Sequence, residues 1–404
     1  MYLDVAFDVN NANGLGSGFT HINWTNNTGH AYIKKASVNI GSSEIDSYTS
    51  EFSDIYNELT DHHEEENILI NKHNCKNSYL KSNSGSLKDL QMMIPLKFWF
   101  NRNIGLSLPV VAMEYNQNVN VKLVLRNPQT LINHSGDGTA GILNSSNLSS
   151  TVKMYATGIY LDEPEKKRFK CAKHEYLIEQ FHQEQETVLS SNISWKGLTN
   201  PVKEIYFVIR TPTRFTEQKT FTAATNPPPA TNVDATLNIS ALSNLSGNDS
   251  TSSTGAQLND YFNYTFGGTE ERPVTAIASG ACLNGLGHTA AADHFDTLKI
   301  KIGSGVGNIT QDLKASYYRT VQPRFAGHKI PQKHIYCYSF STDPEKHQPT
   351  GTLNFSSGSS QMDFNFGNIN QAGTTARKIT LYVVNYNVFV VDASCNHIGL
   401  KFTN

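Results

Sequence analysis

Residues 332–356 read QKHIYCYSFSTDPEKHQPTGTLNFS, and this pattern predicts a strand, a turn and a second strand. Residues 335–340 are mostly aromatic or β-favouring. Two proline-containing pairs and Gly351 then interrupt the run, because proline fixes φ and lacks an amide hydrogen while glycine permits positive φ. We interpret residues 347–351 as a rigid turn at one end of a β-domain, and His347 as a turn or interface residue rather than a catalytic base.

The composition is typical of an all-β protein. Of 404 residues, 17% are charged, the formal net charge is -2 and the pI is near 6.7. This near-neutral balance argues against a protein that coats nucleic acid, which would need a basic face. The chain is rich in Asn, Ser, Thr, Gly, Tyr and Phe, which favours strands joined by long polar loops. Its length is sufficient for about two to three ordinary domains.

The cysteines and the N-terminal residues predict a protein that stays in a reducing compartment. The cysteines are odd in number and widely spaced, and none forms a CxxC pair: Cys75, Cys171, Cys282, Cys337 and Cys395. We expect free, mostly buried thiols. The start MYLDVAFDVNN lacks the basic and apolar regions of a secretory signal. No apolar run approaches the roughly 18 residues that a membrane-spanning helix needs.

Alternation of apolar and polar residues predicts short strands along the whole chain. Residues 204–210 are nearly all apolar, which predicts a strand buried on both faces. By contrast, residues 1–30 are rich in Asn and Gly, and we interpret them as open chain. The other predicted strands are residues 36–40, 119–125, 152–161, 298–302 and the long β-favouring run 379–391.

Two segments carry a helical or mixed pattern. Residues 45–59 have apolar side chains at helical spacing, which predicts a short helix within a β-domain. Residues 166–186 are ambiguous, because their charge favours a helical turn whereas Tyr176, Ile178 and Gln180 alternate as in a strand.

The strands fall into two successive sets with a junction near residue 190. No long helix separates the strands, so a βαβ architecture is disfavoured and sandwich or jelly-roll domains are the natural class. Residues 211–292 contain a proline run and a Ser/Thr/Asn/Gly tract that cannot build a core. They predict a long exposed loop, which in a compact domain is usually functional.

No motif for catalysis, metal binding or phosphate binding stands out. The run HHEEE at residues 62–66 lacks HExxH spacing, and we expect a solvated acidic loop. Residues 14–18 and 303–307 are glycine-rich but lack the Gly-Lys-Ser/Thr of a phosphate loop, so we expect turns. There is no GxSxG elbow and no evident carboxylate pair. We therefore predict no enzymatic activity, no cofactor, and no catalytic or metal-binding residue.

The remaining candidates also favour structural roles. The basic cluster at residues 166–168 is expected to be solvated or to form salt bridges between subunits rather than to bind nucleic acid. Residues 98–100 (Phe-Trp-Phe) are expected in the core rather than on a sugar-binding platform. Asn-x-Ser/Thr sequons are frequent, as chance predicts for this composition, and those at residues 238–248 leave surface glycans as an open alternative.

Several separate stretches resemble, in the same order, segments of the major capsid proteins of nucleocytoplasmic large DNA viruses. Residues 332–356 resemble the family segment YSF…P…HQPSGT.NFS. The other matching stretches are WTNNTGHAYIKKASVNIGSSEIDSYTSEFSDIYNELT (24–60), IPLKFWFNRNIGLSLPVVAMEYNQNVNVKL (94–123), GIYLDEPEKKRFKCAKHEYLIEQ (158–180), NPVKEIYFVIR (200–210), YYRTVQP (317–323) and residues 383–404.

The resemblance implies an all-β fold of two tandem eight-stranded antiparallel jelly rolls with long loops and a few short helices. The first would span residues 1–190 and the second residues 191–404, with a long exposed loop at about 211–292. The first matching stretch begins at residue 24. This start predicts that the N-terminal strand of the family is shortened or missing here.

The resemblance further implies a structural capsid protein without enzymatic activity. Three copies would form a pseudo-hexagonal capsomer, and such capsomers would tile an icosahedral virion shell over an inner membrane after assembly in the host cytoplasm. The expected partners are neighbouring capsomers, minor capsid proteins and, indirectly, the membrane, with no direct contact to nucleic acid. Two alternatives stay open: a minor capsid or scaffold paralogue, and a jelly-roll carbohydrate-binding protein or hydrolase that uses Trp99 and Trp195.

Overall fold

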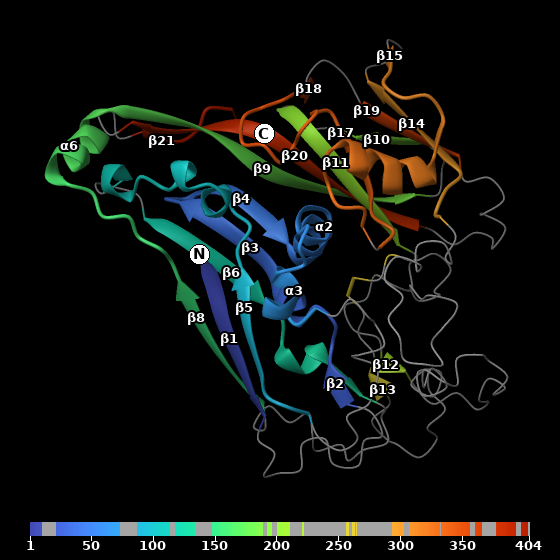
Figure 1. Cartoon of the computed structure of the whole chain (residues 1–404), viewed down its shortest axis with the longest axis horizontal. Helices are drawn as coiled ribbons and strands as arrows, with labels where there is room; N and C mark the ends of the chain where they lie inside the picture. Colours follow the sequence, from blue (N-terminus) through green and yellow to red (C-terminus); the bar gives the residue numbers. More distant parts are fainter. Residues whose placement is uncertain are drawn as a thin grey trace.

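The structure is a computed structural model of the chain (Figure 1). It describes residues 1–9, 22–72, 87–113, 118–134, 148–188, 192–195, 200–210, 220–221, 256–257, 261–262, 264, 293–302, 307–331, 333–355, 360–365, 377–392 and 397–402. Within these residues the strands form five sheets that enclose two hydrophobic cores.

Three sheets surround the first core. Two of them have the strand orders β5-β1-β8 and β4-β3-β6, and a third small sheet has the order β12-β13-β7-β2. Their strands are β1 (Tyr2–Val9), β2 (Ile22–Trp24), β3 (Ile33–Ile40), β4 (Ser43–Thr49), β5 (Leu90–Pro95), β6 (Val119–Leu125), β7 (Ile132–His134), β8 (Leu148–Tyr155), β12 (Thr220–Phe221) and β13 (Ala256–Gln257).

The other two sheets enclose the second core. The central sheet has the order β17-β11-β20-β21, with β18 paired to β11 and β9 paired to β20. It consists of β9 (Lys173–Val188), β11 (Pro201–Arg210), β17 (Tyr336–Ser339), β18 (Leu353–Asn354), β20 (Arg377–Asp392) and β21 (His397–Leu400). The distal sheet consists of β10 (Asn192–Trp195), β14 (Thr297–Ile302), β15 (Gly307–Asn308), β16 (Leu313–Lys314) and β19 (Ser360–Asn365).

Short helices connect the strands, and the longest of those described, α2, covers one face of the central sheet (Figure 1). They are α1 (Thr28–Tyr32), α2 (Ser50–Thr60), α3 (Glu66–Leu69), α5 (Trp99–Arg102), η2 (Ile104–Leu106), η3 (Val110–Met113), η4 (Pro128–Leu131), α6 (Glu163–Cys171), η10 (Tyr317–Val321) and α9 (Gln322–Phe325). No helix among the described residues is long and apolar enough to cross a membrane.

The pairing of β9 with β20 links the two cores. These strands run antiparallel over 16 residues each, from Lys173 opposite Asp392 to Val188 opposite Arg377. In Figure 1 they cross the molecule from α6 to the distal sheet. Strand β20 contributes to both cores: Phe389 near its C-terminal end and Tyr382 near its start belong to the first, whereas Leu381 belongs to the second.

The central sheet is buried on both faces. Successive strand residues point to opposite faces, so Tyr206 and Val208 of β11 pack in the first core while Phe207 and Ile209 pack in the second. All four are fully buried. The prediction that residues 204–210 form a doubly buried strand is confirmed.

Aromatic rings fill the space on each side of the sheet. On the first side, the ring of Phe52 from α2 lies 4.1 Å from Phe181 of β9 and 5.7 Å from Tyr382 of β20, between ring centroids. On the second side, Phe207 stacks on Tyr336 at 5.2 Å, and the neighbouring rings include Phe295, Phe364 and Tyr318. Burial of such rings is the main favourable contribution to folding.

Two sequence-based interpretations need correction. Residues 2–9 are strand β1, the middle strand of its sheet, and not open chain. The alternation of buried Leu3, Val5 and Phe7 with Asp4 carried that signal, but the neighbouring Asn/Gly-rich segment obscured it. The predicted helix 45–59 is partly wrong, because residues up to Thr49 extend β4 by pairing with β3 and the helix starts at Ser50.

Other expectations hold in part. Both signals in the ambiguous segment 166–186 are real, since α6 ends at Cys171 and β9 begins at Lys173. Most of residues 211–292 lie outside the described part of the chain. Of the aromatic residues described within that range, Tyr261, Phe262 and Tyr264 are buried in the first core and are not exposed.

Because the second core depends on β20, a cavity there should be costly. Leu381→Ala removes a fully buried side chain, and we expect it to lower the free energy of unfolding by about 2–5 kcal/mol. The matched control is Leu177→Ala on β9, where the side chain is 37% exposed and the loss should stay below about 1 kcal/mol. Chemical denaturation of both variants measures the two free energies of unfolding. An equal loss of free energy in both variants would contradict the packing of β20 in the second core.

Candidate functional site

The most concentrated polar arrangement lies beside the first core, around three cations that follow α9. We call His328, Lys329 and Lys333 the basic segment. Each of them binds a carboxylate from another part of the chain, and two of the partners lie in the first 70 residues. The basic segment therefore ties the chain that enters β17 to the helices that cover the central sheet.

Lys333 binds the most deeply buried of these carboxylates. Its Nζ lies 2.6 Å from Asp54 Oδ1 and 2.7 Å from Oδ2, and the Asp54 side chain in α2 has no exposed surface. The Tyr264 hydroxyl donates to Asp54 Oδ2 at 3.1 Å, and the Asn27 amide donates to Oδ1 at 2.7 Å. The carboxylate is thus surrounded by donors, as a buried charge requires.

A second ion pair adjoins the first. Glu58, one turn after Asp54 in α2, lies 3.0 Å from Lys72 Nζ and 3.9 Å from Lys333 Nζ. Burial acts to raise the pKa of Glu58, but the charges of Lys72 and Lys333 outweigh it and lower the pKa to about 2. Glu58 is therefore ionised at neutral pH.

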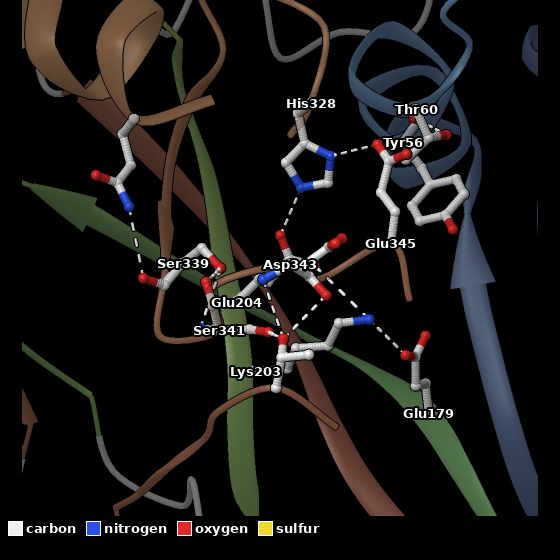
Figure 2. Close-up of polar contacts among 12 residues, drawn as sticks. Tyr56, Thr60, Glu179, Lys203, Glu204, His328, Ser339, Ser341, Asp343 and Glu345 are labelled. Carbon is white, nitrogen blue, oxygen red and sulfur yellow. Dashed lines mark hydrogen bonds and ion pairs between the residues drawn. The ribbon is translucent and has the colours of Figure 1, made fainter. Parts of the chain in front are cut away.

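His328 lies between two carboxylates (Figure 2). Its Nε2 is 2.6 Å from Glu204 Oε2 on β11, and its Nδ1 is 2.8 Å from Glu345 Oε1. Glu345 also accepts from His62, just beyond α2, at 3.1 Å. A carboxylate only accepts hydrogen bonds, so both ring nitrogens of His328 donate and the ring is an imidazolium.

The pKa of His328 agrees with this geometry. Burial acts to lower the pKa, but the charge of Glu204 and the hydrogen bonds to Glu204 and Glu345 raise it to about 9. With both nitrogens donating, the ring has no lone pair with which to act as a general base. The arrangement therefore stabilises the fold and does not resemble a catalytic histidine.

A third group of charges completes the arrangement. Glu179 on β9 accepts from both Lys203 of β11 and Arg102 of α5. Burial acts to raise the pKa of Glu179, but these two cations lower it. Lys203, Glu179, Glu204 and His328, shown in Figure 2, also line a cavity of about 340 Å³. Trp99 is part of its apolar wall. Each of these charged groups has an oppositely charged partner.

The turn predicted at residues 347–351 holds Glu345 in position. Thr350 Oγ1 donates to the Asp343 carbonyl at 3.0 Å, and the Asp343 amide donates to the same hydroxyl at 3.0 Å. Gly351 has φ of 154°, and a Cβ there would lie 2.6 Å from the Phe340 carbonyl oxygen. Glycine is therefore required. The turn itself lies at residues 344–345, slightly before the predicted 347–351, which begin as a bend, and His347 is an exposed residue that lines the cavity.

The acidic run at residues 62–66 differs from its prediction. We expected a solvated loop, but only part of it is solvated: His62 contacts Glu345, Glu64 lies 2.5 Å from Lys329, and Glu66 accepts from Lys97 and His30. The prediction missed these contacts because they belong to the tertiary structure: two of the partners lie more than 260 positions away in the sequence. Among the described residues no group of three His, Cys, Asp or Glu could hold a metal ion.

The other candidates are placed as follows. Phe98 and Trp99 are buried, which confirms their assignment to the core, and Phe100 is half-buried. The basic cluster at 166–168 lies on α6, where Lys166 pairs with Glu163 at 2.7 Å. Cys337 is buried but Cys171 is exposed. Residues 14–18, residues 303–306, the sequons at 238–248 and the other three cysteines lie outside the described residues, as does the side chain of Trp195.

Comparisons with known proteins give the family. A family model described as large eukaryotic DNA virus major capsid protein matches residues 165–396, and one for the major capsid protein N-terminus matches residues 1–162. The major capsid protein of Phaeocystis pouchetii virus is 27% identical over 441 residues, 96% of this chain and 84% of that protein. That of Pyramimonas orientalis virus is 34% identical over 184 residues, 45% of this chain and 43% of that protein.

Solved structures of viral capsid proteins have the same fold as this chain. A quasi-atomic model of the PBCV-1 virus capsid matches with a TM-score of 0.64 at 19% identity, covering 100% of this chain and 90% of that one. The Faustovirus major capsid protein matches with a TM-score of 0.58 at 11% identity, covering 93% of this chain and 74% of that one. The fold is therefore that of the all-β, double jelly-roll capsid proteins. The chain belongs to the family of large eukaryotic DNA virus major capsid proteins, and its role is that of a structural capsid protein.

The buried ion pairs lead to a stability prediction. Lys333→Met leaves Asp54 as a buried charge without its cation, and we expect a loss of about 3–5 kcal/mol in the free energy of unfolding. The control is Lys346→Met, which removes an exposed partner of Asp343 and should cost about 0–1 kcal/mol. In denaturant titrations, a Lys333→Met variant as stable as the control would show that the pair does not hold the basic segment to α2.

His328 leads to a pH prediction. Its pKa in the folded protein is raised above the ordinary value of 6.5, so its contribution is fully present below pH 6.5 and is lost as the pH rises through about 9. The difference between these two pKa values corresponds to a stabilisation of about 3 kcal/mol, at about 1.4 kcal/mol per pKa unit. Unfolding curves between pH 6.5 and 10 should therefore fall more steeply for the unmodified chain than for His328→Gln. Parallel pH profiles would rule out a charged His328.

Proposed function

We propose that this chain is the principal shell subunit of a large DNA virus. Three copies assemble into a capsomer with a pseudo-hexagonal outline, and capsomers tile an icosahedral shell over an inner membrane. The observation that carries this proposal is the joining of two jelly rolls into one body through β9 and β20. Three such bodies present six similar units, and a closed three-fold ring uses one pair of complementary surfaces three times.

The edge of the sheet β5-β1-β8 supports an assembly surface there. In β8, Val152 and Met154 lie opposite Val5 and Leu3 of β1. Val5 and Leu3 are fully buried, whereas Val152 is 37% exposed and Met154 is 50% exposed. The adjacent Tyr155 is 45% exposed. Apolar side chains that point inward at an uncovered sheet edge are costly to leave in water. We assign this edge to the contact between copies in the capsomer.

The proposal includes the remaining expectations about organisation and partners. The two jelly rolls span residues 1–190 and 191–404 with eight strands each, although the shared central sheet joins their cores. The chain has no catalytic, cofactor or metal site and contacts no nucleic acid, which fits its net charge of -2. Capsomers contact one another and minor capsid proteins, meet the membrane indirectly, and assemble in the host cytoplasm. Surface glycans are compatible with this arrangement.

Two alternatives can be separated from this proposal. A minor capsid or scaffold paralogue would share the fold and the family, and copy number in purified particles distinguishes it, since a principal subunit is the most abundant shell protein. A carbohydrate-binding role would need exposed aromatic rings, and Trp99 is only 1% exposed. Saturable glycan binding that Trp195→Ala abolishes would favour that role; we expect no binding.

The trimer is tested on the purified protein. Mass measurement in solution should give three times the chain mass of 44.7 kDa, and electron microscopy should show pseudo-hexagonal particles. A well-folded monomer at micromolar concentration would contradict the proposal. The double variant Val152→Asp/Met154→Asp should dissociate into folded monomers. The control Ile68→Asp, at an 87% exposed position in α3, should remain trimeric.

A further inference from the structure

Asp46 is a buried carboxyl group at a junction between two sheets. It lies on β4, which packs against β9 of the central sheet, and it is 4% exposed. Its Oδ1 accepts a hydrogen bond from the Phe181 amide at 3.2 Å, whereas its Oδ2 is buried without a hydrogen-bond partner in the described part of the chain. An ionised carboxylate is strongly disfavoured in such a place, because one oxygen has lost water and gained no donor.

The charges around Asp46 do not compensate for this. Arg102 of α5 is already bound to Glu179 of β9, and Lys35 of β3 is bound to Glu44 on the same strand as Asp46. Glu44 itself adds a like charge.

The other titratable groups nearby have partners of their own. The Tyr48 hydroxyl accepts from the Lys97 amide, and His182 of β9 pairs with Glu184. Burial raises the pKa of Asp46 to about 7, although the backbone hydrogen bonds from Phe181 and Ser47 and the charge of Arg102 act to lower it.

The residues beside Asp46 hold the two sheets together. Gln180 of β9 donates to the Ile45 carbonyl of β4 and accepts from the Asn387 amide of β20 at 2.7 Å. Asn387 in turn donates to the Phe402 carbonyl at 2.8 Å. This polar chain therefore links β4, β9, β20 and the segment after β21.

The same junction is incompletely filled. A cavity of about 480 Å³ opens beside it, lined among others by Ser47, Phe181 and His182. Water thus has access close to the buried carboxyl group if the sheets separate slightly.

We propose that Asp46 is a proton-controlled contact between β4 and the central sheet. In neutral or mildly acidic solution its carboxyl group is uncharged, and the polar chain through Gln180 keeps the two sheets together. Above neutral pH the group releases its proton to solvent, and the resulting carboxylate draws water from the adjacent cavity into the junction. The contact loosens, so the capsid protein becomes easier to open as the pH rises. This inference holds for a single chain and does not depend on the trimer.

The direction of the effect follows from proton linkage. The folded protein binds this proton more tightly than the unfolded chain, whose Asp has a pKa near 3.8. The contribution to stability is therefore full below pH 3.8 and is lost as the pH rises through about 7. Between pH 6 and pH 8, the ratio of folded to unfolded protein should fall about tenfold because of Asp46 alone.

The test uses the full chain and the variant Asp46→Asn, which keeps the shape but cannot ionise. Denaturant titrations at pH 6, 7 and 8 give the ratio of folded to unfolded protein for the variant and for the unmodified chain. The ratio of the unmodified chain, divided by that of the variant, should fall about tenfold from pH 6 to pH 8. His182→Gln is the control, and it should keep the pH dependence of the unmodified chain. A stability difference that is the same at pH 6 and pH 8 would overturn the proposal.

A second measurement needs no variant. Hydrogen exchange of the unmodified chain at pH 6 and pH 8, corrected for intrinsic rates, compares peptides from β4 and β9 with peptides from β11. Opening of β4 and the adjoining part of β9 should be about tenfold more frequent at pH 8, relative to β11. Equal protection of both regions at the two pH values would show that Asp46 does not control the contact.

Discussion

The structure depends on one constraint, which is that the central sheet is buried on both faces. Strand β20 pairs with β9 along its whole length and with β11 along its first half, so it has no free edge and no solvated face there. Removing any part of this sheet from its neighbours would expose both cores at once. The two jelly rolls can therefore behave as one unit.

Burial on both faces also explains the unusual placement of charge. Polar groups at the sheet surface cannot reach bulk water, so they need partners from other elements. Asp54, Glu204 and Glu179 each accept from a cation of a different segment. Such pairs add little net stability compared with apolar packing. They do make one relative placement of the helices, the basic segment and the central sheet strongly preferred, because any other placement leaves a buried charge unpaired.

Much of the fold, but little of the polar arrangement, could be predicted from sequence. The largely apolar run at 204–210 and the long β-favouring run at 379–391 identified the two strands at the centre of the molecule. Periodicity missed β1, because Asn and Gly next to it suggested open chain. It placed the start of α2 too early, because Ile45 and Tyr48 are buried equally well in a strand. The pair between Asp54 and Lys333 spans 279 positions, and no local pattern tells which of the chain's acidic and basic residues will meet.

The most direct test of the shared-sheet account is hydrogen exchange along β20. Amide protection is measured separately for peptides that cover residues 377–384, whose side chains alternate between the two cores, and residues 385–392, which contribute to the first core. If the sheet joins both cores into one unit, the two halves of β20 exchange slowly and with the same free energy of opening. Two clearly different opening free energies, with one half of β20 exchanging while the other stays protected, would contradict the account.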